Sequence, residues 1–326
     1  MPGPTLLTIT CVIPIQRVRA AAARAAPHVL RTPMVPVEGA LLKLECLQPT
    51  GSFKVRGFFA AALALPPESL RRGLLTVSAG NAAQACAYAA KKLGVPCRVV
   101  MFDTAPETKV TGVKRWGATP IPMPRDQLFG WIADEGWHDE PESFIHPFAD
   151  EEVMAGHGGI GLELLDDVPD LGRVVIPVGG GGLVTGIASA IQGMRPEVEI
   201  IGVQSDGYPL WERAFAAGGA PAAIQPGTIA DGTTAPFDRH MYDLLKEGVD
   251  RWLIVPEPRL KAAVPQLASA AKVVAEGAGA LAYAALEQLT PGPTTVAIVS
   301  GGNIDPALLA SLLSSRSAES SPTARA

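Results

Sequence analysis

The sequence predicts an α/β fold of two lobes, each a mostly parallel, twisted sheet flanked by helices. Short apolar stretches alternate with helical patterns over residues 74–123, with short connections, and a second series of this kind follows further along the chain. This alternation is typical of parallel sheets with right-handed crossovers. A polar stretch with a proline, residues 137–143, separates the two series. We therefore expect a small domain over residues 73–146 and a large domain made of residues 1–72 and 147–326.

The first half of the chain carries clear signals for where helices end. A helix is expected to end before Pro27, and Gly94 and Gly117 are each expected to end another. The expected elements are a helix at 16–26, a strand at 40–47, a helix at 58–65, a strand at 74–77, a helix at 81–93, a strand at 97–102, a helix at 106–116, a strand at 119–123 and a helix at 126–136.

The second half repeats strand, loop and helix around runs of glycine. The expected elements are the end of a strand at 144–148, a helix at 151–165, a strand at 174–178, a helix at 183–192, a strand at 199–204, a loop at 217–226, helices at 261–271 and 279–289, and a strand at 294–299. The tail, residues 314–326, is rich in Ser, Ala and Arg and is expected to be disordered.

The composition excludes several classes of protein. Hydrophobic residues make up 48% of the 326 positions and charged residues 18%, so the chain can build a large core. The net charge is −5 without a basic block, which argues against a nucleic-acid partner. The cysteines have no CxxC or CxxH spacing, which predicts neither a zinc site nor a disulfide framework and suits a reducing cytoplasm; they are Cys11, Cys46, Cys86 and Cys97. The apolar run at 6–15 is too short to span a membrane. It also follows no basic residue, so it matches the pattern of a signal peptide only weakly.

Lys54 stands between a turn of small residues, 50–52, and an apolar run that predicts a helix. Near a helix N-terminus the free N–H groups and the macrodipole disfavour an extra positive charge, so a partly buried lysine there has a lowered pKa. A neutral amine is the form that Schiff-base chemistry needs. A single lysine is more often a solvated surface residue. Three other loops favour the catalytic interpretation.

Four consecutive glycines, Gly179 to Gly182, follow an apolar strand and precede a helix that opens with Leu183. In such a loop successive N–H groups converge, and the helix N-terminus adds the positive end of its dipole, which together favour a phosphate. The loop lacks the GK[ST] of a Walker motif and the spacing of G-x-G-x-x-G. The alternative is a tight turn between strand and helix, which rarely needs four glycines.

Two further loops follow strands. Residues 78–81 (Ser-Ala-Gly-Asn) precede a helix, and their amides and hydroxyl suit a carboxylate, although Asn81 is alternatively a simple helix N-cap. Ser300 places a neutral hydroxyl after the last strand. Together the four loops suit one ligand, pyridoxal 5'-phosphate, with its phosphate on the glycines, its aldehyde on Lys54, its ring oxygen near Asn81 and its ring nitrogen near Ser300.

Several motifs follow one another in a fixed order. They are residues 51–57 (GSFKVRG), 78–81 (SAGN) with Gln84, Ala105-Pro106 with Lys109, Gly117-Ala118, His146-Pro147-Phe148, residues 179–183 (GGGGL), 229–232 (IADG), Glu276 with Gly279-Ala280, and 300–303 (SGGN). In this order the chain resembles the threonine/serine dehydratase group of the fold-type II (tryptophan-synthase-β-like) pyridoxal-phosphate enzymes. The resemblance runs from about residue 15 to residue 307.

The resemblance implies a role for each motif. Lys54 carries the cofactor as a Schiff base and later moves the α-proton. The implied cofactor contacts are Phe53, Lys54, Asn81, Gly179, Gly180, Gly181, Gly182, Leu183 and Ser300. The implied substrate contacts are Ser78, Ala79, Gly80 and Ala82. The implied reaction is α,β-elimination from a β-hydroxy amino acid such as L-threonine or L-serine, giving a 2-oxo acid and ammonia, in a homodimer. A neutral serine at the pyridine nitrogen favours elimination over transamination.

The chain also departs from this family. Relatives that racemise serine carry a second Ser where this chain has Ala79, which predicts little racemase activity. Ala82 replaces a His that is common in the family and so admits a larger or more polar β-hydroxy amino acid. Relatives with a divalent metal site have acidic residues after the strand that here ends at Gln204, and neither Tyr208 nor Leu210 replaces them, so no metal site is expected.

Other functions remain open. Within the same fold these are a lyase for 3-hydroxyaspartate or a phenylserine-like substrate, and a β-replacement enzyme, although the latter usually has a Thr-rich phosphate loop. A degenerate pyridoxal-phosphate-binding homologue is the non-enzymatic alternative. A nicotinamide dehydrogenase leaves Lys54 and Ser300 without roles. The chain ends soon after Ser300, so we expect none of the C-terminal regulatory domain of the biosynthetic, isoleucine-inhibited members.

Overall fold

Ten strands form two separate sheets in the computed structural model, which describes residues 12–319. The strands are β1 (Met34–Val37), β2 (Ala40–Lys43), β3 (Leu74–Val77), β4 (Cys97–Phe102), β5 (Thr119–Met123), β6 (Ser143–Phe144), β7 (Leu171–Pro177), β8 (Glu199–Ser205), β9 (Arg251–Val255) and β10 (Thr294–Ile298). The larger sheet has the order β1-β2-β10-β7-β8-β9, and within residues 12–319 its only antiparallel pair is β1 with β2. The smaller sheet, β5-β4-β3-β6, is parallel throughout. The α/β class with two mostly parallel sheets is confirmed.

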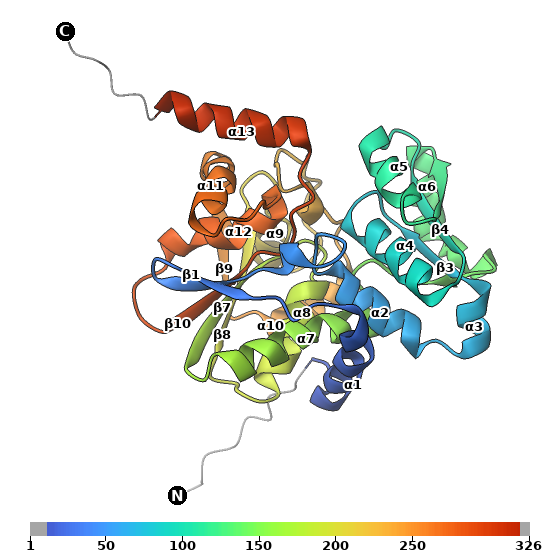
Figure 1. Cartoon of the computed structure of the whole chain (residues 1–326), viewed down its shortest axis with the longest axis horizontal. Coiled ribbons are helices and arrows are strands. Elements are labelled where there is room, and N and C mark those ends of the chain that lie inside the picture. The colour runs from blue at the N-terminus through green and yellow to red at the C-terminus, as the bar shows by residue number, and fades with distance from the viewer. Residues whose placement is uncertain (1–11, 320–326) are drawn as a thin grey trace, which may run out of the picture.

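Helices cover both faces of the larger sheet. The α-helices are α1 (Ile15–Ala25), α2 (Lys54–Ala64), α3 (Pro67–Arg72), α4 (Asn81–Leu93), α5 (Glu107–Lys114), α6 (Arg125–Ala133), α7 (Glu151–Asp167), α8 (Gly182–Gln192), α9 (Leu210–Ala217), α10 (Arg239–Gly248), α11 (Glu257–Ala270), α12 (Gly277–Ala285) and α13 (Pro306–Glu319). Figure 1 shows α3 to α6 with β3 and β4 on one side of the molecule, and the larger sheet with its helices on the other. Between residues 12 and 319 no helix is long and apolar enough to cross a membrane.

Alternating side chains of the central strands face the two helical layers. On β7, Val174 and Ile176 belong to the same core cluster as residues of α7 and α8, whereas Val175 between them belongs to the cluster of α11 and α12. On β10, Val296 and Ala297 divide in the same way. Because successive side chains of a strand point to opposite faces, a strand buried on both faces appears in sequence as an unbroken apolar run.

The topology brings the predicted functional loops to one edge of each sheet. Strands β2, β10 and β7 are parallel neighbours, so the loops that follow them leave from the same edge. These loops carry Lys54, Ser300 and the four glycines respectively. In the smaller sheet the loops after β3 and β6 also leave together, because these two strands are parallel neighbours. Ligands of open parallel sheets bind at such carboxyl edges.

Several elements differ from the sequence prediction. The strand expected at 40–47 ends at Lys43, where a short 3-10 helix, η2 (Glu45–Leu47), follows, and the helix expected from residue 58 already begins at Lys54. Among the α-helices and strands, those that were not predicted are β1, α3, α9, α10, β9 and α13. Of these, β1 and β9 are the two edges of the larger sheet, where one side of the strand has no neighbour and most side chains are only half-buried.

The expectation of a disordered tail from residue 314 is wrong for its first part. Helix α13 runs to Glu319, and residues 320–326 lie outside the described part. Asp305 begins this helix by accepting hydrogen bonds from the N–H groups of Ala307 and Leu308 at 2.8 and 3.1 Å. Leu312 is buried in the cluster formed by α11 and α12. Cys11 and most of the apolar run at 6–15 also lie outside the described residues.

Candidate functional site

A cavity of about 480 Å³ lies among these loops. Residues of both sheets line it, from Val77 and Phe102 at the ends of β3 and β4 to Pro177 at the end of β7. Every residue predicted to contact cofactor or substrate is part of its wall: Phe53, Lys54, Ser78, Ala79, Gly80, Asn81, Ala82, Gly179, Gly180, Gly181, Gly182, Leu183 and Ser300. The structure therefore brings together all of the predicted positions, which span nearly 250 residues of sequence between Phe53 and Ser300.

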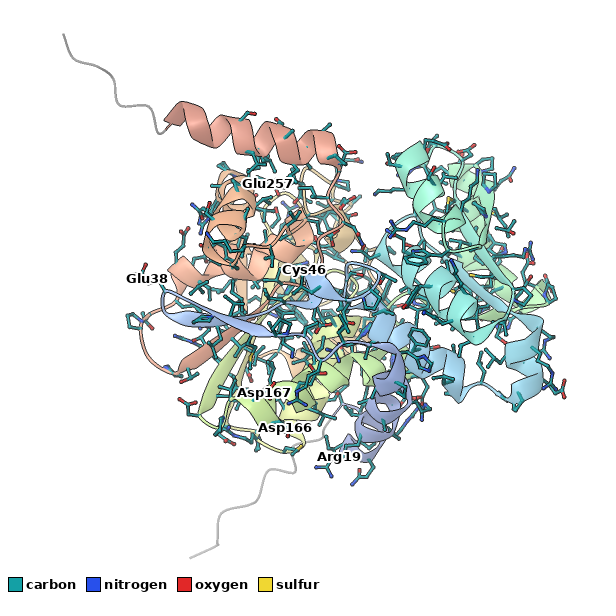
Figure 2. All side chains as sticks on the ribbon, in the orientation of Figure 1. Arg19, Glu38, Cys46, Asp166, Asp167 and Glu257 are labelled. Atoms are coloured by element: carbon teal, nitrogen blue, oxygen red, sulfur yellow. The ribbon has the colours of Figure 1, made fainter. Side chains whose placement is uncertain are left out.

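Backbone pairing joins the segment before Lys54 to the segment around Ser300. The N–H of Cys46 donates to the carbonyl of Val299 at 3.0 Å, and the N–H of Phe53 donates to the carbonyl of Ser300 at 3.0 Å. Figure 2 shows Cys46 near the centre of the molecule, on the segment that leads from β2 to α2. These bonds extend the β2–β10 contact beyond the strands. They fix the Lys54 and Ser300 loops side by side.

The Lys54 amine lies in a desolvated position. Its Nζ donates a hydrogen bond to the carbonyl oxygen of Pro147 at 2.6 Å and lies 5.1 Å from the centre of the Phe53 ring. Burial lowers the pKa of Lys54 from 10.5 to about 8. The helix begins at Lys54 itself, so the amine also lies beside the positive end of α2. A pKa of about 8 leaves about one tenth of the amine neutral at pH 7, and its lowering is as predicted from the sequence.

Arg56 anchors the first turn of α2. Its guanidinium group is 3% exposed and donates to the carboxylate of Glu45 at 2.8 Å and to that of Glu163 at 2.7 Å. Lys43, which is fully buried, donates to Glu163 at 2.6 Å and to the Thr32 carbonyl at 2.7 Å. Two buried cations thus meet two carboxylates with their donors satisfied, which is the arrangement that a buried ionic group requires. The network ties α2 to α7 and to the β2 segment, two residues from Lys54.

Close contacts explain why the loop after β7 consists of glycines. A Cβ at Gly180 would overlap the Phe148 ring, and one at Gly179 would lie 2.8 Å from the Cα of Thr233. Gly181 has φ +96°, a left-handed conformation that favours glycine. The loop is thus enclosed by neighbouring backbone and ring atoms, which leaves its N–H groups at the start of α8 as its functional surface.

The Trp211 indole also holds this loop. The ring is fully buried and its Nε1 donates to the Gly179 carbonyl. Gln204 in turn accepts from the N–H of Trp211 at 2.8 Å and donates to the Val178 carbonyl at 3.3 Å. Gln204 therefore links β8 to the start of α9 and to the glycine loop.

In residues 12–319 no group of three or more His, Cys, Asp or Glu side chains is arranged to hold a metal ion.

Asn81 reaches into the site and does not cap its own helix. Its Nδ2 donates to Glu276 at 2.6 Å, and its Oδ1 accepts from Asn303 at 2.7 Å. The N-cap position of α4 belongs to Gly80, so the alternative interpretation of Asn81 as a helix cap is wrong. The two bonds fix the orientation of the amide. One Nδ2 hydrogen is engaged and the second remains to donate to a ligand.

Glu276 was given no role by sequence reasoning, although its motif was noted. The carboxyl group is 6% exposed and lines the cavity. Burial raises the pKa of Glu276 from 4.5 to about 7, with Asp231 adding to the rise and the hydrogen bond from Asn81 opposing it. A carboxyl group that titrates near neutrality in a cavity is a common feature of active sites. The signal in the sequence was an acid directly before the small-residue run that forms α12.

The loop after β3 presents amides and a hydroxyl to the cavity. The Ser78 hydroxyl accepts from the Gly80 N–H at 3.0 Å, and helix α4 begins at the next residue, Asn81. Ala82 is 4% exposed and lies in the first turn of α4. First-turn N–H groups have no intrahelical carbonyl to bind, which suits them to a carboxylate.

An ion pair crosses the mouth of the cavity. Lys109, on α5, donates to Asp231 at 2.8 Å, in the short helix η4 (Asp231–Thr233). Both residues line the cavity, and their side chains are 40% and 62% exposed. The pair connects the part of the chain around the smaller sheet to the part around the larger sheet. Such exposed pairs contribute at most about 1 kcal/mol.

Comparison with known proteins decides the class of this site. A family model described as "Pyridoxal-phosphate dependent enzyme" matches residues 25–301. The chain belongs to this family. It is 41% identical to the L-threonine ammonia-lyase of Thermotoga maritima over 274 residues, which are 81% of this chain and 67% of that protein. It is 37% identical to a catabolic L-threonine dehydratase of Staphylococcus aureus over 300 residues, 86% of each protein.

Solved structures of the family share the fold. A threonine deaminase from T.th. is 36% identical with a TM-score of 0.81, over 90% of this chain and 99% of that one. Maize serine racemase is 30% identical with a TM-score of 0.86, over 94% of this chain and 99% of that one. The two-lobed fold type II architecture of pyridoxal-phosphate enzymes is thus confirmed for this chain.

The residues of the cavity fit the cofactor. The glycine loop offers helix N-terminal amides for a phosphate, and Lys54 offers an amine with a pKa of about 8 for the aldehyde. The free Nδ2 hydrogen of Asn81 suits a phenolate oxygen. Ser300 is 4% exposed and brings a neutral hydroxyl to the cavity wall, which suits an uncharged ring nitrogen. Each polar group of pyridoxal phosphate therefore has a matching group in one cavity.

Proposed function

We propose that this protein is a pyridoxal-phosphate ammonia-lyase that converts a β-hydroxy amino acid, such as L-threonine or L-serine, into a 2-oxo acid and ammonia. The observation that carries the proposal is Lys54, an amine with a lowered pKa in the same cavity as the glycine loop, Asn81 and Ser300. The named activities of the relatives, L-threonine ammonia-lyase and L-threonine dehydratase, support it. In the reaction one water leaves the substrate and another is taken up when ammonia is released.

The cofactor site is formed by residues from both ends of the chain. We assign the phosphate to the amides of Gly179 to Gly182 and of Leu183, the ring face to Phe53, the ring oxygen to Asn81 and the ring nitrogen to Ser300. When bound, the cofactor withdraws electrons from the substrate Cα, which acidifies its hydrogen and weakens the bond to the β-hydroxyl. Because Ser300 is neutral, it does not hold a proton on the ring nitrogen as a carboxylate does.

Lys54 acts as the base that removes the α-proton once substrate is bound in the cofactor site. Proton removal needs the neutral amine, and a pKa of about 8 provides it at a useful fraction near neutral pH. The Pro147 carbonyl, 2.6 Å from Nζ, holds the amine at the cavity wall. We assign the substrate carboxylate to the loop formed by Ser78, Ala79 and Gly80 and to the first turn of α4 at Ala82. There the small Ala82 side chain leaves room for the substituent on Cβ.

The test is release of 2-oxo acid and ammonia from L-serine, L-threonine, D-serine, 3-hydroxyaspartate and phenylserine, with Lys54→Ala as the control. We expect turnover of L-threonine or L-serine that is lost in the control. Activity only on 3-hydroxyaspartate or phenylserine would keep the elimination chemistry and change the substrate. A yellow protein that is silent on every compound would contradict the proposal and favour β-replacement or a degenerate homologue.

Racemisation is a second candidate, because structures of serine racemases from maize and Dictyostelium discoideum resemble this chain. Reprotonation from the face opposite Lys54 needs an acid there, and Ala79 offers none. We expect D-serine to form from L-serine at under about one hundredth of the elimination rate, since a missing acid–base group costs 10²–10⁴-fold. Chiral chromatography of the reaction measures this. Ala79→Ser is expected to raise the yield, and abundant D-serine from the unchanged protein would contradict the assignment.

We further propose the domain division, assembly and compartment given by the sequence: domains at 73–146 and at 1–72 with 147–326, a homodimer, and the cytoplasm. The homodimer is supported by three apolar side chains that are 44–49% exposed, those of Leu30, Leu47 and Val274. They lie close to one another around the segment 46–48. Leu30 is hydrogen-bonded to Gln48, next to Leu47, and the Val274 carbonyl lies close to Gly302, beside Cys46. Sedimentation of the protein and of Leu47→Asp tests this, and a monomer in both would contradict it.

A further inference from the structure

The turn that receives the Lys54 amine is held by a histidine. His146 follows β6, and its Nδ1 accepts hydrogen bonds from the N–H groups of Phe148 at 3.3 Å and of Ala149 at 2.9 Å. Nδ1 must therefore be unprotonated, and Nε2 carries the ring hydrogen. The pKa of His146 is lowered from 6.5 to about 4, mainly by burial; Asp238 opposes this shift and Lys54 contributes to it. The ring is neutral throughout the physiological range.

This turn contacts both halves of the cofactor site. Its first peptide presents the Pro147 carbonyl to Lys54 Nζ at 2.6 Å. Its next residue, Phe148, packs its ring against Gly180 and its carbonyl against Gly182. A change in the turn would therefore move the acceptor for the amine and the support of the glycine loop at the same time. The two His146 hydrogen bonds fix the backbone at these two residues.

We propose that His146 is a positioning residue. It holds Pro147 and Phe148 so that the Lys54 amine and the glycine loop lie at the relative positions that binding of pyridoxal phosphate requires. The inference rests on the proposed function, because it concerns the same cofactor site. The role requires no contact of His146 with substrate or cofactor. His146 acts through the Pro147 carbonyl and the Phe148 ring.

The competing explanation is simple packing. The His146 ring makes edge contacts with Phe144 and Phe148, with ring centres 6.0 and 4.6 Å apart. A matched pair of substitutions separates the two explanations. His146→Asn keeps an acceptor atom bonded to Cγ, as in the turns that Asn commonly forms with the N–H groups two and three residues on, but removes the ring. His146→Phe keeps a ring of similar size and removes the acceptor.

The readout is the rate at which the full-length protein, stripped of cofactor with hydroxylamine, rebinds pyridoxal phosphate at Lys54. It is followed by the visible absorbance of the lysine-bound cofactor, and the attachment site is identified by borohydride reduction and mass spectrometry. We expect His146→Asn to stay within about threefold of the unchanged protein and His146→Phe to rebind about tenfold more slowly or worse, since each lost hydrogen bond accounts for about a factor of ten. Melting temperatures serve as the folding control.

Each outcome decides the matter. Rebinding of folded His146→Phe at the unchanged rate overturns the proposal, and so does slow rebinding by folded His146→Asn. If His146→Phe does not fold, the Asn variant decides alone: the unchanged rate supports the proposal and slow rebinding by the folded variant overturns it. If the unchanged protein itself attaches no cofactor at Lys54, the proposed function fails first, which distinguishes that failure from a failure of the His146 role.

Discussion

Replacing Lys54 by methionine is expected to stabilise the cofactor-free protein while abolishing its activity. Methionine keeps an unbranched side chain of similar length and removes the amine. Burial lowers the pKa of Lys54 from 10.5 to about 8, so the folded protein disfavours the charged amine that the unfolded chain accepts. At about 1.4 kcal/mol per pKa unit, this penalty amounts to about 3 kcal/mol near neutral pH as an upper limit.

The hydrogen bond to Pro147 reduces the net gain. Lys54 Nζ donates to this carbonyl at 2.6 Å, and methionine leaves the oxygen without that donor. The loss of one hydrogen bond from a charged donor costs about 1.5–3 kcal/mol, and the cavity admits water that recovers part of it. A net stabilisation of about 1–2 kcal/mol remains, which raises the melting temperature by a few degrees.

The dependence on pH gives the sharper test. A lysine whose pKa is lowered on folding destabilises the folded state fully below about pH 8 and progressively less as the pH rises toward 10.5. The difference in melting temperature between Lys54→Met and the unchanged protein should therefore be constant below pH 8 and shrink above it. Calorimetry of both cofactor-free proteins at pH 6 to 10 measures this.

A matched control and two outcomes complete the experiment. Lys261 is exposed on α11, and Lys261→Met should change stability by less than about 0.5 kcal/mol at every pH. The reasoning is refuted if Lys54→Met melts at or below the unchanged protein at pH 7, or if its advantage persists undiminished at pH 10. In the same variant, 2-oxo acid release should fall to background.

Two further substitutions test the glycine loop and the buried acid. Gly180→Ala places a Cβ against the Phe148 ring, which should cost about 1–3 kcal/mol of packing. Cofactor binding, measured by fluorescence titration, should weaken by about tenfold or more. The control is Gly130→Ala on exposed α6, where a Cβ meets open space, and equal cofactor affinities of the two variants would contradict the contact. Glu276→Gln keeps an acceptor for Asn81 but no charge. Because the pKa of Glu276 is raised from 4.5 to about 7, the Gln variant should melt higher than the unchanged protein at pH 8 and equally below pH 4.5, and a constant difference across this range would refute the raised pKa.

Local patterns in the sequence predicted most elements around the smaller sheet. Strands at 74–77, 97–102 and 119–123 and the helix at 81–93 have the predicted bounds. The helix is an Ala-rich run that ends at Gly94, and the strands are short, mostly apolar segments followed by Ser78, Asp103 and Pro124. The prediction was poorer where a proline, or charged residues at the start of a helix, interrupted the apolar pattern. Helix α10, for example, begins after Asp238, whose side chain accepts from the Met241 N–H at 2.8 Å, a capping signal that was overlooked.

The sequence by itself determined the class of fold, the set of loops that form the site and the cofactor that suits them. These follow from local chemistry: a lysine after a small-residue turn, four glycines between strand and helix, and a hydroxyl after a strand, in an order that the family shares. The individual roles assigned to these residues stay predictions that the experiments above address.

Only the tertiary structure decided how these groups act on one another. Asn81 and Glu276 are 195 positions apart in the chain, and their hydrogen bond fixes the amide and helps to set the pKa of the acid. The Pro147 carbonyl meets Lys54 across 93 positions, and the Phe148 ring makes glycine necessary at 180. Burial and contacts between distant segments arise when whole elements pack, so no local pattern encodes them. For the same reason, the value near 8 for the pKa of Lys54 is a property of the folded protein.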